Sequence, residues 1–527
     1  MSKHFSSKDT LREKITEGVN ILADNVASTL GPRGRNVILQ QKNAMPIITK
    51  DGVTVAKFVD LKDPVMNAGA QLVKQASAKT NVDAGDGTTT STVLTRAIYN
   101  EALKHIEDGI SPVEIKRGID KTVKEVCNRI EDAARPVSSA EDVAHVASIS
   151  ANNDGGIGDI IAMAVDKVGK DGSITIEEAR SVDTTLELVE GFRFDSGYAA
   201  AAFVTDQRRN VARHDRPLFL ITDNKLERVE QILPALEIAA RESRPFVIVA
   251  DDIEGQALAA LIMNTVRGSM KVVAIKAPRY GEERRNIMND LAIATGSRFF
   301  KRELGDDVKE VKLNDFGSAK SIEISKNSTT IVGGDADPVL LDDRIGTLKN
   351  EIEITESLRE CEIIQERITR LASGVAIIKV GAATQVEMLE KKHRIEDALE
   401  AVRSAQMEGI VPGGGTILFR ISQDLSLPPD TLENKEQELG LLIIKEALAS
   451  PIRMMSRNSG YDFEEIVAKL SSTSDLKSGI NFNSGELVDL FELGIIDPAK
   501  VTRCALQNAA SVAGILITTD HAIIEAD

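Results

Sequence analysis

The spacing of apolar residues most constrains the fold of this chain, because it changes character twice. From about residue 9 to 130, apolar residues recur near helical spacing, as in "REKITEGVNILADNVASTLG", which ends at Gly31-Pro32. The middle holds short β-branched runs, among them "PLFLITD", "PFVIVAD" and "KVVAIKAP", with helical stretches between them. From Glu351 the pattern is mostly helical again. We interpret this order as a helical body, formed by both chain ends, with an inserted α/β domain.

Within this order, individual elements can be expected. The helical stretches are Met66–Lys79, Thr92–Glu107, Pro112–Ala133, Glu227–Ser243, Gly255–Arg267 and Glu283–Thr295. The segment "VILQQKNAMPIITKDGVTVAKFV" predicts two short strands and a turn at Asp51-Gly52. Gly191, Gly374 and Gly409 lie near the changes of pattern and are either hinges or ordinary turn and cap glycines.

Composition excludes several function classes. Lys and Arg number 64 against 81 Asp and Glu, a net charge of −17, which argues against a nucleic-acid binder. No apolar run reaches the roughly 18 residues of a membrane span, and no signal peptide is expected. Cys127, Cys361 and Cys504 are far apart, which favours a reducing compartment, and we expect a cytoplasmic protein. The histidines form no HExxH motif.

The stretch "DAGDGTTT", Asp83 to Thr90, precedes an amphipathic helix and has a composition that suits an anion. Gly85 and Gly87 let the backbone approach a phosphate, and the three threonines add hydroxyl donors at a helix N-terminus. Asp86 would repel a bare phosphate, but it suits a bridging Mg²⁺ ion. The alternative is that Asp86 caps a threonine-rich helix start and binds nothing.

Three further loops favour the phosphate-binding interpretation over the simple helix cap. "TLGPRGRN" (29–36) and "VPGGGT" (411–416) are glycine-rich, and "TKDGVTVA" (49–56) puts Lys50 and Asp51 on a turn. Neither a GxxxxGK[ST] nor a GxGxxG motif is present, so the common nucleotide-binding loops are excluded by motif.

Together these loops resemble those of the group I chaperonins, the GroEL-type family. The resemblance extends in order from about residue 10 to 520. It rests on the loops above and on "ISAN", "KVGKDGSITIEE", "VEGFRFDSGY", "NTVRG", "VKVVAIKAP", "LASGVAIIKVGAAT", "RIEDALEAVRSAQMEGIVPGGGT" and "GIIDPAKVTRCALQNAASVAGILITT".

The resemblance implies a multidomain α and α/β fold with three domains. An equatorial ATPase domain would comprise 1–132 and 409–527, an intermediate domain 133–190 and 374–408, and an apical α/β domain 191–373 that binds clients and lid. It also implies homo-oligomeric rings of seven subunits, two of them stacked, and a GroES-like co-chaperonin. ATP and Mg²⁺ would be the cofactors, with K⁺ as a further ion. Non-native polypeptides would be the clients.

By motif, the resemblance also implies the site residues. The nucleotide-binding residues would be Thr29, Leu30, Gly31, Pro32, Lys50, Asp86, Gly87, Thr88, Thr89, Thr90, Gly414, Asn483 and Asp497. Asp86 would ligate Mg²⁺, while Asp51 and Asp397 would flank the terminal phosphate, Asp397 positioning the attacking water. Spacing alone favours reading Asp397 as a solvated acid on a charged helix, and Asp497 is alternatively a helix cap before Pro498. The local alignment at Asn483 is open, because "FNSGEL" departs from the family.

For clients and lid, the resemblance implies an apolar groove between two helices of the apical domain. Its residues would be Tyr198, Phe203, Leu233, Leu236, Leu258, Ile262 and Met263. Such spacing usually marks buried core residues, so spacing alone favours a core and only the resemblance favours an exposed groove.

Several positions depart from the family and support a second hypothesis. Ala199 and Ala202 stand where relatives carry larger apolar groups, and Ser196 and Gln385 where the best-known relatives have a charged pair. The C-terminus lacks Gly-Gly-Met repeats. The alternative to an ATP-driven folding chamber is therefore a holdase, or a specialised ring with weaker lid coupling or cooperativity. A small-molecule ATP-dependent enzyme lacks an identifiable second substrate site.

Overall fold

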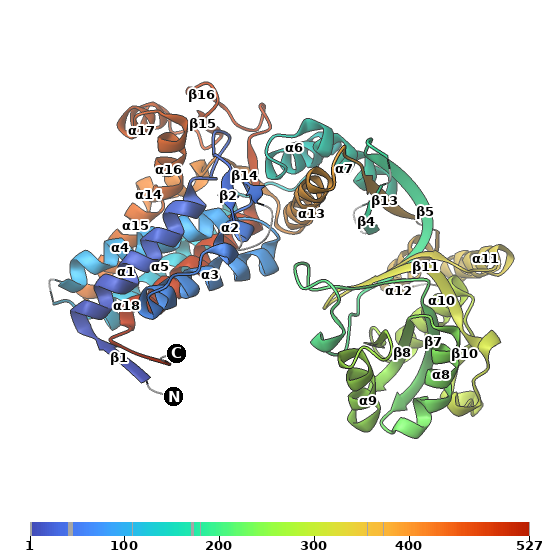
Figure 1. Ribbon diagram of the computed structural model, residues 1–527. Helices are drawn as coiled ribbons and strands as arrows, with labels where there is room; N and C mark the ends of the chain where they lie inside the picture. Colours follow the sequence, from blue (N-terminus) through green and yellow to red (C-terminus); the bar gives the residue numbers. More distant parts are fainter. Residues whose placement is uncertain are drawn as a thin grey trace. The chain divides into compact units, whose positions relative to one another are not determined.

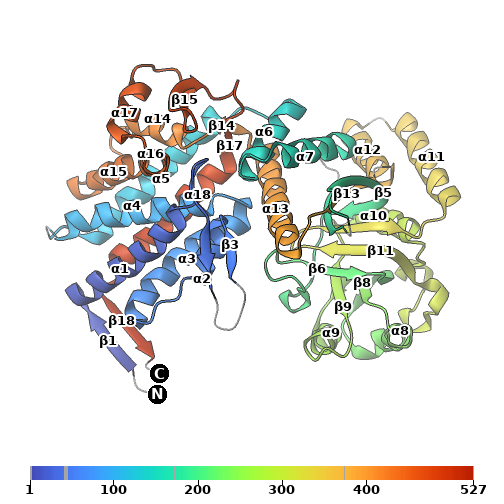
Figure 2. The same ribbon diagram turned by 45° about the horizontal axis from the view of Figure 1, so that its top comes forward.

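The computed structural model describes residues 3–40, 46–107, 109–169, 173–179, 181–355, 357–372 and 374–525 (Figures 1 and 2). The chain divides into two compact units. Unit 1 joins Met1–Met163 to Ala382–Asp527, and unit 2 is the continuous segment Ala164–Gly381. Both chain ends therefore belong to one body that a middle unit interrupts, as the apolar spacing predicts. The finer division into equatorial, intermediate and apical segments stays a prediction.

Unit 1 consists mainly of long helices that pack around a shared apolar core. The principal helices are α1 (Lys8–Ala27), α3 (Pro64–Ala84), α4 (Thr88–Glu107), α5 (Pro112–Ala133), α15 (Lys435–Ala447) and α18 (Ala499–Thr518). Helix α18 contacts α3, α4 and α5 and buries side chains on several faces. Leu94, Ile98 and Leu506 are fully buried in this core. A helix from the end of the chain thus completes the core that the first helices begin.

Shorter elements of unit 1 carry most of the loops that matter below. The helices are α2 (Gly52–Phe58), α6 (Ala140–Ser150), α13 (Gln385–Glu408), α14 (Thr416–Asp424), α16 (Ser450–Ser459) and α17 (Phe463–Ser471), while α7 (Gly155–Val168) begins in unit 1 and ends in unit 2. The antiparallel strand pairs are β1 (Lys3–Ser7) with β18 (His521–Glu525), β2 (Val37–Leu39) with β3 (Ile47–Thr49), β14 (Ile410–Pro412) with β17 (Ile496–Pro498), and β15 (Ser478–Asn481) with β16 (Glu486–Asp489).

Helices α3 and α4 have clear local start and stop signals. The Asp63 side chain accepts hydrogen bonds from the Val65 and Met66 amides, and Pro64 occupies the first turn of α3. Gly85 ends α3 in the left-handed conformation at φ 75°. Helix α4 then begins at Thr88, four residues before the predicted Thr92. The low helix propensity of threonine therefore places the predicted start of this helix too late. Within α4, the Thr92 and Thr95 hydroxyls donate hydrogen bonds to carbonyls one turn earlier.

Unit 2 is a mixed sheet with helices packed against it (Figure 2). The strand order is β4-β13-β5-β12-β11-β7-β8-β9, with β10 beside β7 and β6 beside β11. The strands are β4 (Ser173–Glu178), β5 (Thr185–Phe194), β6 (Ala212–Asp215), β7 (Leu218–Leu226), β8 (Phe246–Ile253), β9 (Val272–Lys276), β10 (Phe299–Phe300), β11 (Gly317–Ile324), β12 (Thr329–Gly334) and β13 (Gly374–Val380). The α-helices are α8 (Val229–Glu242), α9 (Gly255–Val266), α10 (Gly281–Thr295), α11 (Pro338–Ile354) and α12 (Leu358–Ala372).

The parallel strands β7, β8 and β9 alternate with α8 and α9, which confirms the predicted α/β character of the middle of the chain. Phe219, Ile248 and Val273 are fully buried in its core. Strands β11 and β12 were not predicted. Their sequences "GSAKSIEI" and "TTIVGG" are too polar or glycine-rich to stand out as apolar runs, and their antiparallel pairing stabilises them.

The predicted turn at Asp51-Gly52 is wrong. The Asp51 carboxylate accepts hydrogen bonds from the Val53 and Thr54 amides at 3.1 and 3.0 Å, so these residues begin α2 instead. Among the glycines, Gly191 lies within β5, and a methyl group built there would come within 2.2 Å of Val375. Close packing therefore accounts for that glycine. No helix in the described part of the chain is long and apolar enough to cross a membrane.

Candidate functional site

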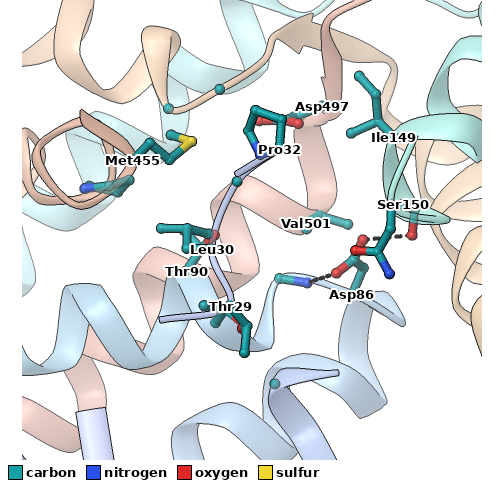
Figure 3. Close-up of a pocket in the computed structure, with 18 of the residues that line it drawn as sticks. Thr29, Leu30, Pro32, Asp86, Thr90, Ile149, Ser150, Met455, Asp497 and Val501 are labelled. Carbon is teal, nitrogen blue, oxygen red and sulfur yellow. Dashed lines mark hydrogen bonds between the residues drawn. The ribbon is translucent and has the colours of Figure 1, made fainter. Parts of the chain in front are cut away.

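A cavity of about 300 Å³ opens in unit 1 where several loops meet (Figure 3). The loops after α1, before α2, before α4 and after β14 all contribute, together with α6, α13, α16 and α18. All fifteen predicted nucleotide and catalytic residues line it: Thr29, Leu30, Gly31, Pro32, Lys50, Asp51, Asp86, Gly87, Thr88, Thr89, Thr90, Asp397, Gly414, Asn483 and Asp497. The fold therefore brings together residues that are spread over more than 450 positions of the chain.

Glycines let the backbone form the cavity wall. Gly31, Gly87 and Gly414 have φ values of 84°, 83° and 62°, which favour glycine. A methyl group at Gly87 would lie 2.7 Å from the Val501 side chain. At Gly414 a methyl group would meet nothing within 4 Å, so the backbone there borders open space. This exposed glycine backbone can approach an anion closely.

The N-terminus of α4 lies against two other loops. A methyl group at Gly52 would come within 2.2 Å of Thr89 Oγ1, and Thr29 Oγ1 lies 3.4 Å from Thr89 Oγ1. Helix α4 has 20 residues, and its first turn carries Thr88, Thr89 and Thr90. The backbone amides of this first turn and its threonine hydroxyls lie at the cavity and form a favourable environment for phosphate.

Asp86 precedes this helix and is held by two donors (Figure 3). Ser150 Oγ donates to one carboxylate oxygen at 2.8 Å, and the Gly87 amide donates to the other at 2.5 Å. Burial raises the pKa of Asp86, and the nearby charge of Asp51 raises it further. A cation at this carboxylate would relieve both effects.

The chemistry of these residues is compatible with Mg²⁺ bound together with phosphate. No cluster of three or more His, Cys, Asp or Glu side chains in the described residues forms a metal site by itself. Mg²⁺ commonly takes one or two carboxylates and completes its coordination with substrate phosphates and water. Asp86 can supply the carboxylate, and Lys50, whose pKa is lowered by burial, adds a cationic side chain to the wall.

Asp397 reaches the cavity from α13, which is fixed to the Asp86 loop. Ser404 Oγ donates to the Ala84 carbonyl at 2.8 Å. A methyl group at Gly85 would come within 2.1 Å of Glu400 Cβ, so this glycine permits close contact with α13. One turn before Asp397, Arg394 pairs with Asp154 at 3.1 Å. Packing rather than local sequence therefore directs Asp397 to the loops.

Asp497 lies on β17 opposite Val411 of β14. The amides of Gly414 and Gly415 donate to its side chain, while burial and the charge of Asp86 raise its pKa to about 6. Thus Asp497 is a cavity-wall acceptor under the glycine loop rather than a simple helix cap.

Sequence reasoning missed the apolar wall of the cavity. The missed apolar lining includes Val146, Leu418, Pro451, Met455, Ile480, Phe482, Ile496 and Val501. These residues lie in ordinary apolar patterns and carry no signal of their own. Ser150 was within the quoted "ISAN" motif, but its bond to Asp86 depends on the packing of α6.

The predicted client-binding residues of unit 2 differ in exposure. Leu233 and Met263 are exposed, each at 46%, while Tyr198, Leu258 and Ile262 are partly buried against the core. Phe203 and Leu236 are buried at 0% and 5%. The expectation that these last two lie open is therefore wrong. Leu236 shares the inner face of α8 with Ile232 and Ala239, and Phe203 packs into the core from the short 3₁₀ helix Ala201–Phe203.

Comparisons with known proteins agree with this architecture. A family model described as the TCP-1/cpn60 chaperonin family matches residues 22–527. Two crystal forms of the chaperonin gp146 from the bacteriophage EL 2 (Pseudomonas aeruginosa), both solved in the presence of ATP-BeFx, are similar in fold. They give TM-scores of 0.66 and 0.63 at 20% sequence identity, with 99% of each chain covered.

Proposed function

Because this chain belongs to the TCP-1/cpn60 chaperonin family, we propose that it is an ATP-dependent chaperone of the group I type that captures non-native polypeptides. In this proposal ATP hydrolysis in unit 1 drives folding inside a ring cavity closed by a GroES-like co-chaperonin. The ring would contain seven subunits, stacked as two rings in the cytoplasm. The observation that carries the proposal is the cavity lined by all fifteen predicted residues. The bacteriophage chaperonin of similar fold was crystallised with ATP-BeFx, which supports a nucleotide as the ligand.

The residues of the cavity suit phosphoryl transfer, in which positioning and charge neutralisation do most of the work. The glycine loops and the start of α4 would hold the phosphates, with Lys50 as a further cation. Bound Mg²⁺ would neutralise phosphate charge, and Asp86 would hold it. Asp397 would orient the attacking water and accept its proton. The Asp51 carboxylate would flank the terminal phosphate while it holds the first turn of α2.

Client capture would use the apolar side chains exposed on α8 and α9 of unit 2. Leu233 and Met263 would contact the client first, and the partly buried Tyr198, Leu258 and Ile262 would extend this surface. Such a surface binds exposed apolar segments without directional requirements. A co-chaperonin loop on the same surface would displace the client.

The burial of Phe203 and Leu236 favours a second candidate function, because it leaves less apolar area for the client and the lid. Ser196, whose hydroxyl donates to the Lys276 carbonyl, and Gln385 also carry no charge for a pairing between subunits. A holdase or a specialised ring with weak lid coupling or cooperativity would show these features.

Refolding of a denatured client distinguishes the two functions. We expect the protein to restore activity of a stringent client when ATP, Mg²⁺ and a GroES-like co-chaperonin are present, and much less without nucleotide. Suppressed aggregation with equal recovery in the presence and absence of ATP would support the holdase instead. Gel filtration and particle images of the same samples would report the ring size.

A further inference from the structure

Helix α13 presents more than Asp397 to the cavity. Glu390, His393, Arg394 and Asp397 all line it, and their spacing of three or four residues places them on one helical face. Arg394 is engaged by Asp154 at 3.1 Å and by Glu390 at 2.8 Å. His393 is partly buried, and no hydrogen bond or ion pair to another described residue holds its imidazole. An imidazole that faces the cavity one turn before Asp397 is therefore available to a ligand.

The charges of the cavity wall show what such a group would contribute. Its lining carboxylates are Asp51, Asp86, Glu390, Asp397 and Asp497. Among the described residues, its cationic lining side chains are Lys50 and Arg394, and Arg394 is already paired. A polyphosphate would thus meet an excess of negative charge, which favours every additional donor or cation near its terminal group.

We propose that His393 contacts the terminal phosphate of the bound nucleotide by donating a hydrogen bond from its imidazole, most strongly as the imidazolium. This inference rests on the proposed function, because that function places the terminal phosphate near Asp397. Histidine changes its charge near neutral pH, so the contact makes nucleotide affinity depend on pH. Affinity is therefore expected to rise as pH falls across the range in which an imidazole gains its second proton.

The groups that share this environment come from several elements. Helix α13 itself contributes Glu390, Arg394 and Asp397, the loop before α2 contributes Lys50 and Asp51, the loop before α4 contributes Asp86, and β17 contributes Asp497. Asp154, beyond α6, approaches through Arg394. The lining residues from α6 and α18, which also pack against α13, are uncharged. Because all of these groups remain in a His393 variant, their titration is common to both proteins.

The test compares ATP affinity of the full-length wild type, His393→Ala and His393→Lys at about pH 6 and about pH 8, on either side of the usual histidine pKa. We expect His393→Ala to bind ATP about tenfold more weakly than the wild type at the lower pH, as suits a charge-assisted hydrogen bond, and with a smaller deficit at the higher pH. His393→Lys should restore tight binding at both values. His393→Asn, which retains a donor without a titratable charge, should bind ATP more tightly than His393→Ala by the same factor at both pH values.

The titrations of Asp497 and of ATP itself affect both proteins, so they cancel in the ratio of wild-type to variant ATP affinity. A ratio of one at both pH values, or a deficit in His393→Ala that is the same at both, would overturn the inference while leaving the proposed function intact. Absence of ATP binding by the wild type at either pH would instead remove the proposed function and the inference with it. Thermal unfolding of each variant establishes that it is folded.

Discussion

The two regions with predicted function, the loop cavity of unit 1 and the α8–α9 surface of unit 2, relate to the sequence in opposite ways. In unit 1, all fifteen predicted residues line one cavity. In unit 2, only Leu233 and Met263 of the seven predicted residues are clearly exposed. The difference arises from chemistry. A glycine loop with an acid and three threonines has little use in a core, whereas an apolar residue at helical spacing serves a core as well as it serves a binding surface.

The largest expected effect tests the surface of unit 2. Leu236→Ala should lower the free energy of unfolding by about 2–5 kcal/mol, because it leaves a cavity beneath α8. Leu233→Ala, three residues away and 46% exposed, should change it by about 0.5 kcal/mol or less. Urea unfolding of the full-length protein, monitored at the transition of unit 2, measures the free energy of unfolding of both variants.

The same two variants distinguish an effect on stability from an effect on client binding. We expect Leu233→Ala to weaken capture of a denatured client while the protein stays as stable as the wild type. Equal destabilisation by the two substitutions would mean that the two leucines do not differ in burial, and the contrast between the regions would be lost.

The next effect concerns chemistry in unit 1. Asp397→Ala should retain ATP binding but slow hydrolysis by at least about 100-fold, the usual contribution of a positioned general base. Steady-state turnover and equilibrium ATP binding are the measurements. Asp424→Ala is the matched control, since that acid is 82% exposed and outside the cavity. Unchanged turnover in Asp397→Ala would contradict the role assigned to this residue.

The smallest effect is a pH dependence at Asp497. Its pKa of about 6 in the folded protein exceeds the value of about 3.9 expected in the unfolded chain. Between these values the folded state binds more protons, so this carboxyl makes the nucleotide-free protein less stable as pH rises through the window. Asp497→Asn should remove that loss.

We therefore expect Asp497→Asn to be about 1–2 kcal/mol more stable than the wild type at about pH 7 and no more stable at about pH 4. Denaturant unfolding at the two pH values, without nucleotide, measures the difference. A stability change of the same size at both pH values would point to altered packing at Gly414 and Gly415 instead of relief of a buried charge.

Much of the fold could be predicted because local patterns and tertiary structure agree. Helix α5 occupies the predicted Pro112–Ala133, and β7, β8 and β9 follow the apolar runs. The failures have physical causes. Helix α4 extends back to Thr88 because Gly87 and the packed loops allow it, and Asp51 caps α2 because its side chain reaches two amides. Strands β11 and β12 depend on their partners rather than on apolar composition.

The order of helical and α/β segments, the glycine loops and the acids that suit a nucleotide can all be recognised in the chain, because they are local properties of residue type and spacing. Four features could not be recognised there: Asp397 lines the same cavity as Asp86, Ser150 binds Asp86, Met455 and Phe482 complete the wall, and Leu236 is buried while Leu233 is not. Each of these depends on which side of a helix meets a neighbour. Packing between segments far apart in the chain decides this, because buried and exposed residues can have the same helical spacing.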